Sequence, residues 1–391
     1  MDFRFSPEEE AFRQELRRFL DRELPAAWDG RDPFGEGDGE EGWRFQRQFV
    51  SKLARRRWLA MAWPTEYGGL GATHMQQLIY NEEMAYRGAP GATSMGVAWV
   101  GPAIMLYGTD EQKRRYLPGI TSGEDVWCTL YSEPGAGSDL AALQTRAVKD
   151  GDDFVINGQK IWTSGAGRSN WGWLAARTDP EAPKHKGIST FVVDMRTPGI
   201  TIRPLVNMAG GAGFSEVFFE DVRIPKENLV GELNRGWYQV AVALDFERSG
   251  IQTYAAVRRS LEDVVALARE KRGLLEANPH LRLRLADRAV ELQAGTLIAY
   301  RVPWLQSRGI IPNYEASISK LYGSELSQRL ALTGLQLLGL YGLLSLASPW
   351  APLKGRLERA YLWSVATTIA AGTSEIQRSI VAQRGLGMPR Q

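Results

Sequence analysis

The middle of the chain holds the stretch that decides the fold, residues 154–162, with the sequence FVINGQKIW. Apolar residues flank an Asn–Gly pair, a pattern that predicts two short strands joined by a turn at Asn157 and Gly158. Five further strands are predicted around it, at residues 127–131, 173–177, 189–193, 200–204 and 217–222. Because no helical pattern separates these strands, we expect an antiparallel barrel or sandwich.

Helical patterns lie on both sides of this region. Ser6-Pro7-Glu8-Glu9 predicts a helix start, because a capping residue precedes a proline and acidic residues fill the first turn. Long apolar-periodic stretches follow the strands, at residues 254–268 and 281–300. The order helices, strands, helices predicts an α+β protein with three segments, residues 1–122, 123–232 and 233–391.

The composition excludes several classes of function. The 391 residues include 47 Lys and Arg against 45 Asp and Glu, and these charges are mixed throughout, unlike those of a nucleic-acid-binding protein. A single cysteine, Cys128, and three scattered histidines predict neither a disulfide nor a metal site.

No membrane-spanning or secreted segment is expected. The amino-terminal residues lack the basic and apolar regions of a signal peptide, so we expect a cytoplasmic protein. Residues 330–353 carry no charge, but glycines and prolines interrupt them. We therefore expect a buried helix followed by a loop there, not a membrane span.

A loop rich in glycine and serine, residues 132–139 (SEPGAGSD), follows the predicted strand 127–131. Its glycines would let a ligand approach the backbone, and its hydroxyls would bind carbonyl or phosphate oxygens. Trp162 and Ser164 would add a flat aromatic ring and a hydroxyl suited to a flavin. The chain has no dinucleotide-binding G-x-G-x-x-G unit, P-loop or nucleophile elbow. A nucleotide cofactor would therefore bind in another way.

Four ordered motifs carry a resemblance to a known family: residues 132–139 (SEPGAGSD), 157–162 (NGQKIW), 219–225 (FEDVRIP) and 372–378 (GTSEIQR). The chain resembles the flavin-dependent acyl-CoA dehydrogenases nearly from end to end. The resemblance implies an N-terminal helical domain, a middle β domain and a C-terminal four-helix bundle. It also implies an acyl-CoA substrate, FAD as cofactor, an electron-transferring flavoprotein as partner, and a homo-oligomer, tetramer or dimer.

The same resemblance assigns cofactor-binding residues. Around the flavin it implies Leu130, Ser132, Gly137, Ser138, Trp162 and Ser164, and from the terminal motif Thr373 and Glu375. Gln336 and Gly339 lie in a Q-x-x-G-x-x-G stretch that holds the dinucleotide across subunits in the family. Arg272 stands where many members carry an Arg-x-x-Phe-Gly element, but the aromatic residue and the spacing are missing here.

Removal of the α-proton of a thioester requires a desolvated carboxylate with a raised pKa. In many family members a Glu directly before the terminal Gly-Thr is this base, but here the position is Ala371. A subgroup carries the Glu in an L-D-x-E-R pattern, which residues 244–248 (LDFER) match, so Glu247 is the candidate. Asp245 and Arg248 position the ligand or the base, or else form a salt bridge. The expected substrate contacts are Ser138, Asp245, Arg248, Ala371 and Gly372.

Two alternatives remain open. One is a different flavoenzyme on the same scaffold, an acyl-CoA oxidase or a flavin monooxygenase, because fold similarity does not fix the chemistry. The other is a non-catalytic subunit of a hetero-oligomeric dehydrogenase. The changed surroundings of Arg272 weaken the predicted site for the FAD tail, and so they admit a subunit that binds flavin poorly.

Overall fold

A computed structural model describes residues 4–26, 28, 39–91, 94–243, 249–271 and 273–389 of the chain, with the side chains of 241–243 excepted. The chain divides into two compact units. Unit 1 comprises Met1–Gly30, Thr73–Ala89 and Arg248–Gln391, and unit 2 comprises Arg31–Ala72 and Pro90–Glu247. These two units do not correspond one to one to the three segments expected from the sequence, so the segment boundaries stay predictions.

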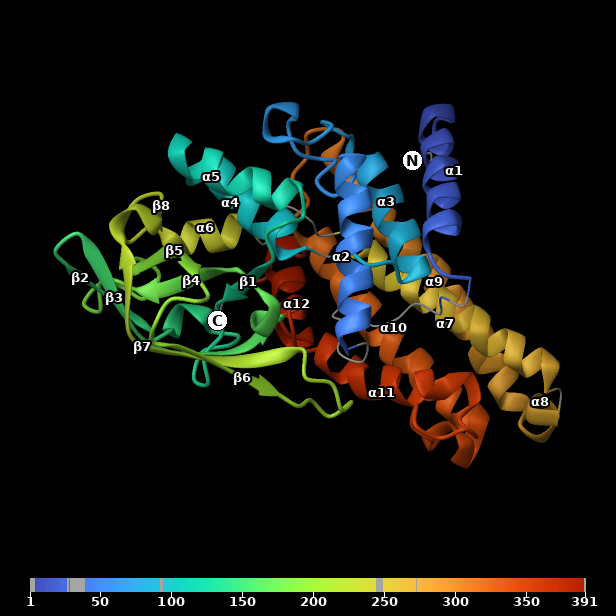
Figure 1. Cartoon of the computed structure of the whole chain (residues 1–391). Coiled ribbons are helices and arrows are strands. Elements are labelled where there is room, and N and C mark those ends of the chain that lie inside the picture. Colours follow the sequence, from blue (N-terminus) through green and yellow to red (C-terminus); the bar gives the residue numbers. More distant parts are fainter. Residues whose placement is uncertain are drawn as a thin grey trace. The chain divides into compact units, whose positions relative to one another are not determined.

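Unit 2 is built on one eight-stranded sheet with the order β6-β7-β3-β2-β4-β5-β8, and β1 pairs with β4 off this path. Figure 1 shows this sheet in green and yellow. Its strands are β1 (Trp127–Leu130), β2 (Arg146–Asp150), β3 (Asp153–Ser164), β4 (Trp171–Arg177), β5 (Ile188–Asp194), β6 (Ile200–Leu205), β7 (Phe214–Pro225) and β8 (Leu229–Val230). The helices of unit 2 are α2 (Gly39–Arg55), α4 (Gly101–Tyr107), α5 (Asp110–Thr121) and α6 (Gly236–Ala243).

The expected α+β order of helices, sheet and helices is confirmed, and most strand pairs are antiparallel. Two pairings differ from the expectation. β1 runs parallel to β4, with Trp127 opposite Trp171, and β2 also pairs with β4 in parallel, at Arg146 opposite Arg177. Parallel strands need a long connection between them, and here the loop 132–139, β2 and β3 separate β1 from β4 in sequence. An apolar cluster that includes Phe154, Phe191 and Val217 is buried within this sheet.

The predicted turn at Asn157 and Gly158 is wrong. Both residues lie inside the continuous strand β3, and the hairpin turn falls earlier, where Asp150 pairs with Asp153. The pairing of β3 with β7 shifts register between Ile156 and Gly158, as at a β-bulge. An Asn–Gly pair indicates a local break in regular strand geometry, and such a break can be a β-bulge as well as a turn.

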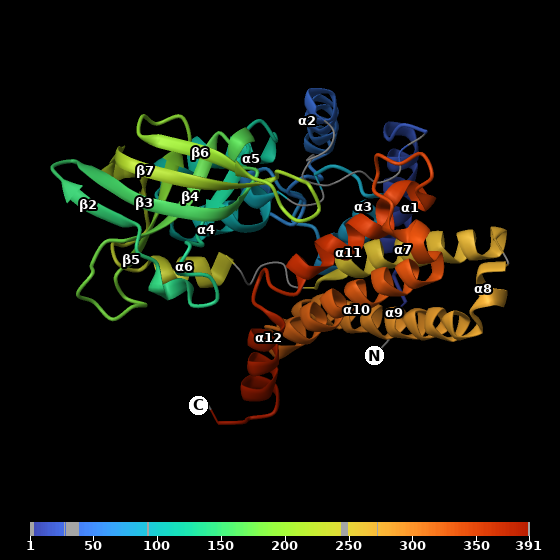
Figure 2. The ribbon, with the colours of Figure 1, turned by 90° about the horizontal axis from the view of Figure 1, so that it is seen from below.

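Unit 1 is helical, and its long helices α7, α9, α10 and α11 lie alongside one another (Figure 2). Its helices are α1 (Pro7–Glu23), α3 (His74–Arg87), α7 (Ile251–Glu270), α8 (Gly273–Ala277), α9 (Pro279–Gln306), α10 (Tyr314–Leu338), α11 (Arg356–Thr367) and α12 (Ser374–Ile380). Ser6 caps α1 as predicted: its hydroxyl accepts from the Glu9 backbone N–H, and the Glu9 carboxylate accepts from that of Ser6. An apolar core that includes Tyr254 joins α3, α7, α9, α10 and α11.

The uncharged stretch 330–353 begins as a buried helix and continues as a loop, as expected. Leu330 and Leu338 are buried in α10. Five large apolar side chains after the helix are exposed: Leu340, Tyr341, Leu343, Leu346 and Trp350. We call these five residues the 340–350 patch. In the part of the chain that the structure describes, no helix is long and apolar enough to cross a membrane.

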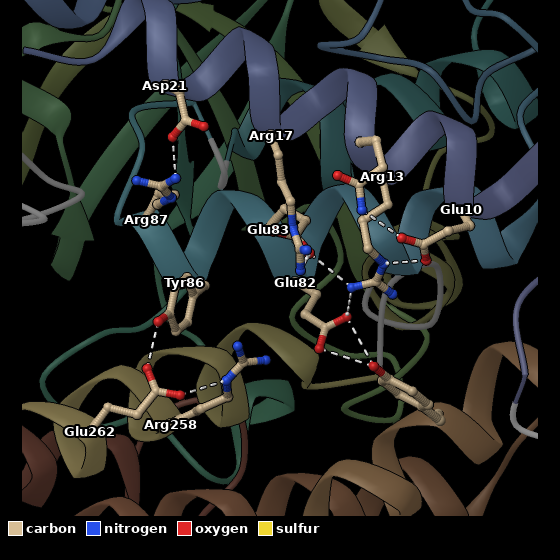
Figure 3. A network of polar contacts seen from close by, with 12 residues as sticks. Glu10, Arg13, Arg17, Asp21, Glu82, Glu83, Tyr86, Arg87, Arg258 and Glu262 are labelled. Atoms are coloured by element: carbon tan, nitrogen blue, oxygen red, sulfur yellow. Dashed lines mark hydrogen bonds and ion pairs between the residues drawn. The ribbon is translucent and has the colours of Figure 1, made fainter. Parts of the chain in front are cut away.

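A buried polar network joins α1, α3 and α9 in unit 1 (Figure 3). The Arg13 guanidinium donates to Glu82 and Glu83 at 2.9 and 2.8 Å, and Arg17 binds Glu83 with two hydrogen bonds. The Tyr300 hydroxyl lies 2.9 Å from both carboxylate oxygens of Glu82. Burial lowers the pKa of Arg13, but the Glu82 carboxylate outweighs it and raises the pKa above the usual value. Arg13 therefore stays charged and ties the first helix to the bundle.

Candidate flavin site

The Gly- and Ser-rich loop lies directly beside the end of β3 in unit 2. The Ile161 backbone N–H donates to the Ser132 carbonyl at 2.9 Å, which brings residues 132–138 next to residues 162–164. Ser138 and Gly137 are exposed, and Ser132 and Ser164 are half-buried. Leu130 is fully buried at the end of β1, where it anchors the start of the loop. The structure therefore brings together the six flavin contacts that the resemblance implies in this unit.

Trp162 presents an aromatic face to solvent, because its side chain is 57% exposed. Its backbone has φ of 59°, a left-handed conformation that is unusual for a bulky residue. The register between β3 and β7 shifts between Lys160 and Thr163, and the ring meets Phe214 edge-on at 6.0 Å. Such strained conformations cluster at functional sites.

A buried ion pair lies at the base of the loop. Lys160 is fully buried, and its ammonium donates to the Glu133 carboxylate at 2.8 Å and to the Tyr131 carbonyl at 3.0 Å. Burial lowers the pKa of Lys160 to about 8, although Glu133 opposes this shift. Burial would raise the pKa of Glu133, but Lys160 outweighs it and lowers that pKa below its usual value. We take both groups as charged near neutral pH.

The terminal motif in unit 1 is held by hydrogen bonds to its backbone. The Thr373 hydroxyl accepts from the Ile376 N–H and caps α12. The Gln377 amide donates to the Ala371 carbonyl at 2.9 Å, and the Lys320 ammonium donates to the Gly372 carbonyl at 2.6 Å. Ala371 is another non-glycine residue with positive φ, at 52°. The predicted substrate contacts Ala371 and Gly372 thus lie in a tight turn before α12.

Of the two charged groups near this motif, Glu375 was predicted from the sequence and Lys320 was not. Hydrogen bonding from its own N–H and from Thr373 lowers the pKa of the exposed Glu375 carboxyl. Burial lowers the pKa of Lys320, and Glu375 opposes that shift. Lys320 lies 52 residues before Gly372 on another helix, so no motif in the sequence indicated this contact.

Gln336, predicted to contact the FAD tail, is exposed near the end of α10, and Gly339 follows with φ of 55°. The Arg284 guanidinium of α9 donates a hydrogen bond to the Gln336 side chain. Arg284 therefore adds a cation to this predicted anion-binding position, which the sequence reasoning missed. Four other predicted residues lie outside the described residues: Asp245, Glu247, Arg248 and Arg272.

The described residues fit a flavin cofactor. In unit 2 the Thr163 hydroxyl, between the predicted contacts Trp162 and Ser164, is buried without a hydrogen-bond partner. In unit 1 the same holds for the Ser374 hydroxyl of the terminal motif. Unpaired buried hydroxyls are costly in proteins, so a bound polar ligand would stabilise them. Gly135 and Gly137 have open space where a Cβ would lie, which leaves room for close approach of a ligand. Serine hydroxyls and the exposed Trp162 ring complete a surface suited to a flat heteroaromatic group.

A separate cavity of about 250 Å³ lies among α3, α7 and α9 in unit 1. Glu82, Arg258 and Tyr300 supply its polar wall, and Ile251, Leu292 and Leu297 supply apolar surface. Among the described residues, none of those predicted to bind flavin or substrate lines this cavity.

Three family models match the chain in order. The acyl-CoA dehydrogenase N-terminal domain matches residues 6–124, the middle domain residues 128–222 and the C-terminal domain residues 234–386. The chain belongs to the acyl-CoA dehydrogenase family. The resemblance inferred from the four motifs is thereby confirmed, and with it the oxidoreductase class of the enzyme.

Acyl-CoA dehydrogenases from Mycobacterium tuberculosis are among the similar proteins. The acyl-CoA dehydrogenase FadE26 of Mycobacterium tuberculosis is 38% identical over 402 residues, which cover 100% of this chain and 99% of that one. A solved structure named Tcur3481-Tcur3483 steroid ACAD is 39% identical, with a TM-score of 0.90 and full coverage of both chains. The ChsE4-ChsE5 complex from Mycobacterium tuberculosis is 37% identical, with a TM-score of 0.89 and full coverage of both chains.

Proposed function

We propose that this acyl-CoA dehydrogenase uses FAD to oxidise an acyl-CoA thioester to its α,β-unsaturated form. The observation that carries the proposal is the exposed Trp162 ring, held by a left-handed backbone beside the hydroxyl-bearing loop 132–138. When bound, FAD supplies the hydride acceptor for the β-carbon of the substrate. Trp162 would stack on the flavin, and Ser132, Ser138 and Ser164 would bind its polar edge.

Glu247 is the proposed base for the α-proton. The turn before α12 offers Ala371 where many relatives carry a glutamate, and alanine has no proton-accepting side chain. The motif LDFER at 244–248 supplies the alternative carboxylate. For this role the pKa of Glu247 must be raised by desolvation, so that it accepts a proton from a weak carbon acid. Asp245 and Arg248 would orient either this carboxylate or the thioester.

We further propose a bulky, fused-ring acyl group as substrate and an electron-transferring flavoprotein as acceptor. The substrate class is supported by similarity to a protein named as a steroid acyl-CoA dehydrogenase. The acceptor is the usual one in the family that the motifs indicate. Rapid reoxidation of the reduced protein by oxygen, faster than by an electron-transferring flavoprotein, would instead favour the oxidase or monooxygenase alternative.

The test is an anaerobic titration of the purified protein with linear, branched and steroid-derived acyl-CoAs, observed through the flavin absorbance. We expect a fused-ring acyl-CoA to bleach the wild-type flavin. The Glu247→Gln variant should bind the same thioester with a shift of the flavin spectrum but bleach it at least about a hundredfold more slowly, since a general base contributes about 10²–10⁴-fold.

Glu262→Gln is the matched control, because Glu262 lies on α7 in an exposed pair with Arg258. It should bleach at the wild-type rate. Bleaching by Glu247→Gln at the wild-type rate would remove Glu247 from the role of base. A wild-type flavin that no acyl-CoA bleaches would contradict the dehydrogenase proposal itself.

A second candidate is a subunit of a hetero-oligomeric dehydrogenase. Two similar structures are named as pairs of different chains, and Arg272 lacks its usual sequence surroundings. If the chain forms a homotetramer or dimer, it will purify alone with about one flavin per chain. If it needs a second chain, it will purify colourless alone and gain flavin when the two are produced together.

A further inference from the structure

We infer that Lys160 and Glu133 are positioning residues that clamp the two ends of the connection between β1 and β2, residues 131–145, which contains the flavin-binding loop. The inference rests on the proposed function, in that residues 132–138 are taken to contact the flavin. Neither side chain is exposed to a ligand, since Lys160 is fully buried and Glu133 nearly so. Both act through the backbone of the loop.

The geometry joins the start of the loop to its end. One Glu133 carboxylate oxygen accepts from Lys160 at 2.8 Å and from the Thr145 N–H at 2.9 Å, and the other accepts from the Gln144 N–H at 2.5 Å. Lys160 also donates to the Tyr131 carbonyl, just before the loop. One buried ion pair therefore fixes residues 131–133 against residues 144–145.

The loop between these ends is mostly exposed, although Ala136 is buried in an apolar cluster with Leu143 and Ala175 and the Ser132 carbonyl accepts from the Ile161 N–H. Pro134, Gly135, Gly137, Ser138 and Asp139 are exposed. The loop also has a turn with two backbone hydrogen bonds between Glu133 and Ala136. An ion pair at the surface joins Asp139 to Lys184. Without the clamp, the backbone and hydroxyl groups that are proposed to bind the flavin would lose their fixed positions. Flavin binding would then have to order the loop, and the entropy cost of that ordering weakens binding.

Replacing a buried ion pair by apolar residues often leaves stability unchanged or improved, so stability alone does not explain the pair. The charged groups that face Lys160 are Glu133 on the loop and Arg177 on β4, and the Tyr131 carbonyl faces it from the end of β1. Arg177 donates in turn to the Ala141 and Leu143 carbonyls, so it supports the same loop end. Burial lowers the pKa of Lys160 to about 8, so loss of its proton above that pH would weaken its charge-assisted bonds to Glu133 and to the Tyr131 carbonyl. The Glu133 bonds to the Gln144 and Thr145 N–H groups and the Arg177 contacts would then hold the segment with less support.

The first experiment measures hydrogen exchange at the amides of Ala136, Gln144 and Thr145 in flavin-free protein. We expect Lys160→Met to speed exchange at these amides about tenfold, as loss of one charge-assisted hydrogen bond implies. The amides that pair Ala175 in β4 with Thr190 in β5 should be unaffected. Lys149→Met, an exposed lysine on β2, is the control and should leave all these amides unchanged.

The second experiment measures FAD affinity by flavin fluorescence from pH 6.5 to 9.5. We expect Lys160→Met to weaken FAD binding about tenfold at neutral pH, because FAD would then have to order a loosened loop when it binds. Wild-type affinity should fall as pH rises through about 8, and this step should be missing in Lys160→Met. Should that variant not fold, Glu133→Gln removes the charge but keeps an acceptor for the loop amides.

The outcomes separate this inference from the proposed function. The clamp would be overturned if Lys160→Met and Glu133→Gln both left hydrogen exchange unchanged at Ala136, Gln144 and Thr145. Faster exchange with unchanged FAD affinity would keep the clamp but remove the loop from the flavin site, and so contradict the proposed function. Weaker affinity without the pH step would show that the pair contributes packing and not its charge, which also overturns the inference.

Discussion

At the scale of single residues, the structure depends on charged side chains that are buried in pairs. Arg13 and Glu82 are both nearly inaccessible to solvent, and 69 residues separate them in sequence. Charged residues are seldom fully buried unless they are paired, and a pair that loses one member leaves an uncompensated charge. Replacing one member of such a buried pair should therefore lower the free energy of unfolding more than replacing a charged residue at the surface.

Arg13→Met tests this network. We expect it to lower the free energy of unfolding by about 3–5 kcal/mol, because Glu82 and Glu83 would stay buried without their cation. Chemical denaturation followed by circular dichroism measures the change.

Arg22→Met on the same helix is the control for Arg13→Met. Arg22 pairs with Glu23 at the surface, so its replacement should cost under about 1 kcal/mol. Equal effects of the two variants would show that burial of the network has no energetic consequence.

At the scale of secondary-structure elements, the main correction concerns Asn157 and Gly158. Asn157 accepts from the Asp221 backbone N–H at 2.9 Å and its amide donates to the Asp221 carboxylate at 3.0 Å. The side chain thus bridges β3 to β7 where their register shifts. Neighbouring strands decide between bulge and turn, and residues 154–162 alone do not contain that information.

Gly158→Ala should disturb this bulge. A Cβ on Gly158 would lie 2.5 Å from Thr145 Oγ1 and 2.7 Å from the Thr145 backbone, at a φ of 150° that side chains rarely adopt. We expect a loss of about 2 kcal/mol or more in the free energy of unfolding, since the backbone must move.

Gly167→Ala is the control for Gly158→Ala, because it finds open space and should stay within about 0.5 kcal/mol of the wild type. Thermal denaturation of the flavin-free protein compares the two variants. An unchanged midpoint for Gly158→Ala would mean that β2 and β3 tolerate a wider separation.

At the scale of the whole molecule, the 340–350 patch bears on assembly. Five large apolar residues within eleven positions are exposed, with Trp350 at 77%. Exposed apolar surface concentrated in this way marks protein interaction sites. The patch follows Gln336 and Gly339, which the family resemblance assigns to a cofactor site shared across subunits, so a neighbouring subunit is the expected occupant.

The variant Leu340→Asp/Trp350→Ser should therefore dissociate the oligomer. Light scattering coupled to size exclusion would show a smaller assembly, while circular dichroism stays that of the wild type. Leu283→Asp, an exposed leucine on α9, should leave the assembly intact. An unchanged mass for the double variant would exclude the patch as a subunit interface.

The sequence by itself determined the order of elements, the α1 cap, most strand positions and the loop that is proposed to bind flavin. These features depend on local patterns: periodicity, capping residues and glycine placement within a few positions. It also determined the family, through motifs spread along the chain. The candidate base Glu247 stays a prediction from sequence, because residues 244–248 lie outside the described residues.

Only the tertiary structure decided the parallel pairing of β1 with β4, the bulge at Gly158 and the partners of Arg13, Lys160 and Lys320. Each depends on contacts between residues far apart in sequence. A lysine or arginine in a strand or helix has the same local pattern whether it faces solvent or a buried carboxylate. The difference arises only when the fold removes both charges from water, and then their pairing becomes obligatory.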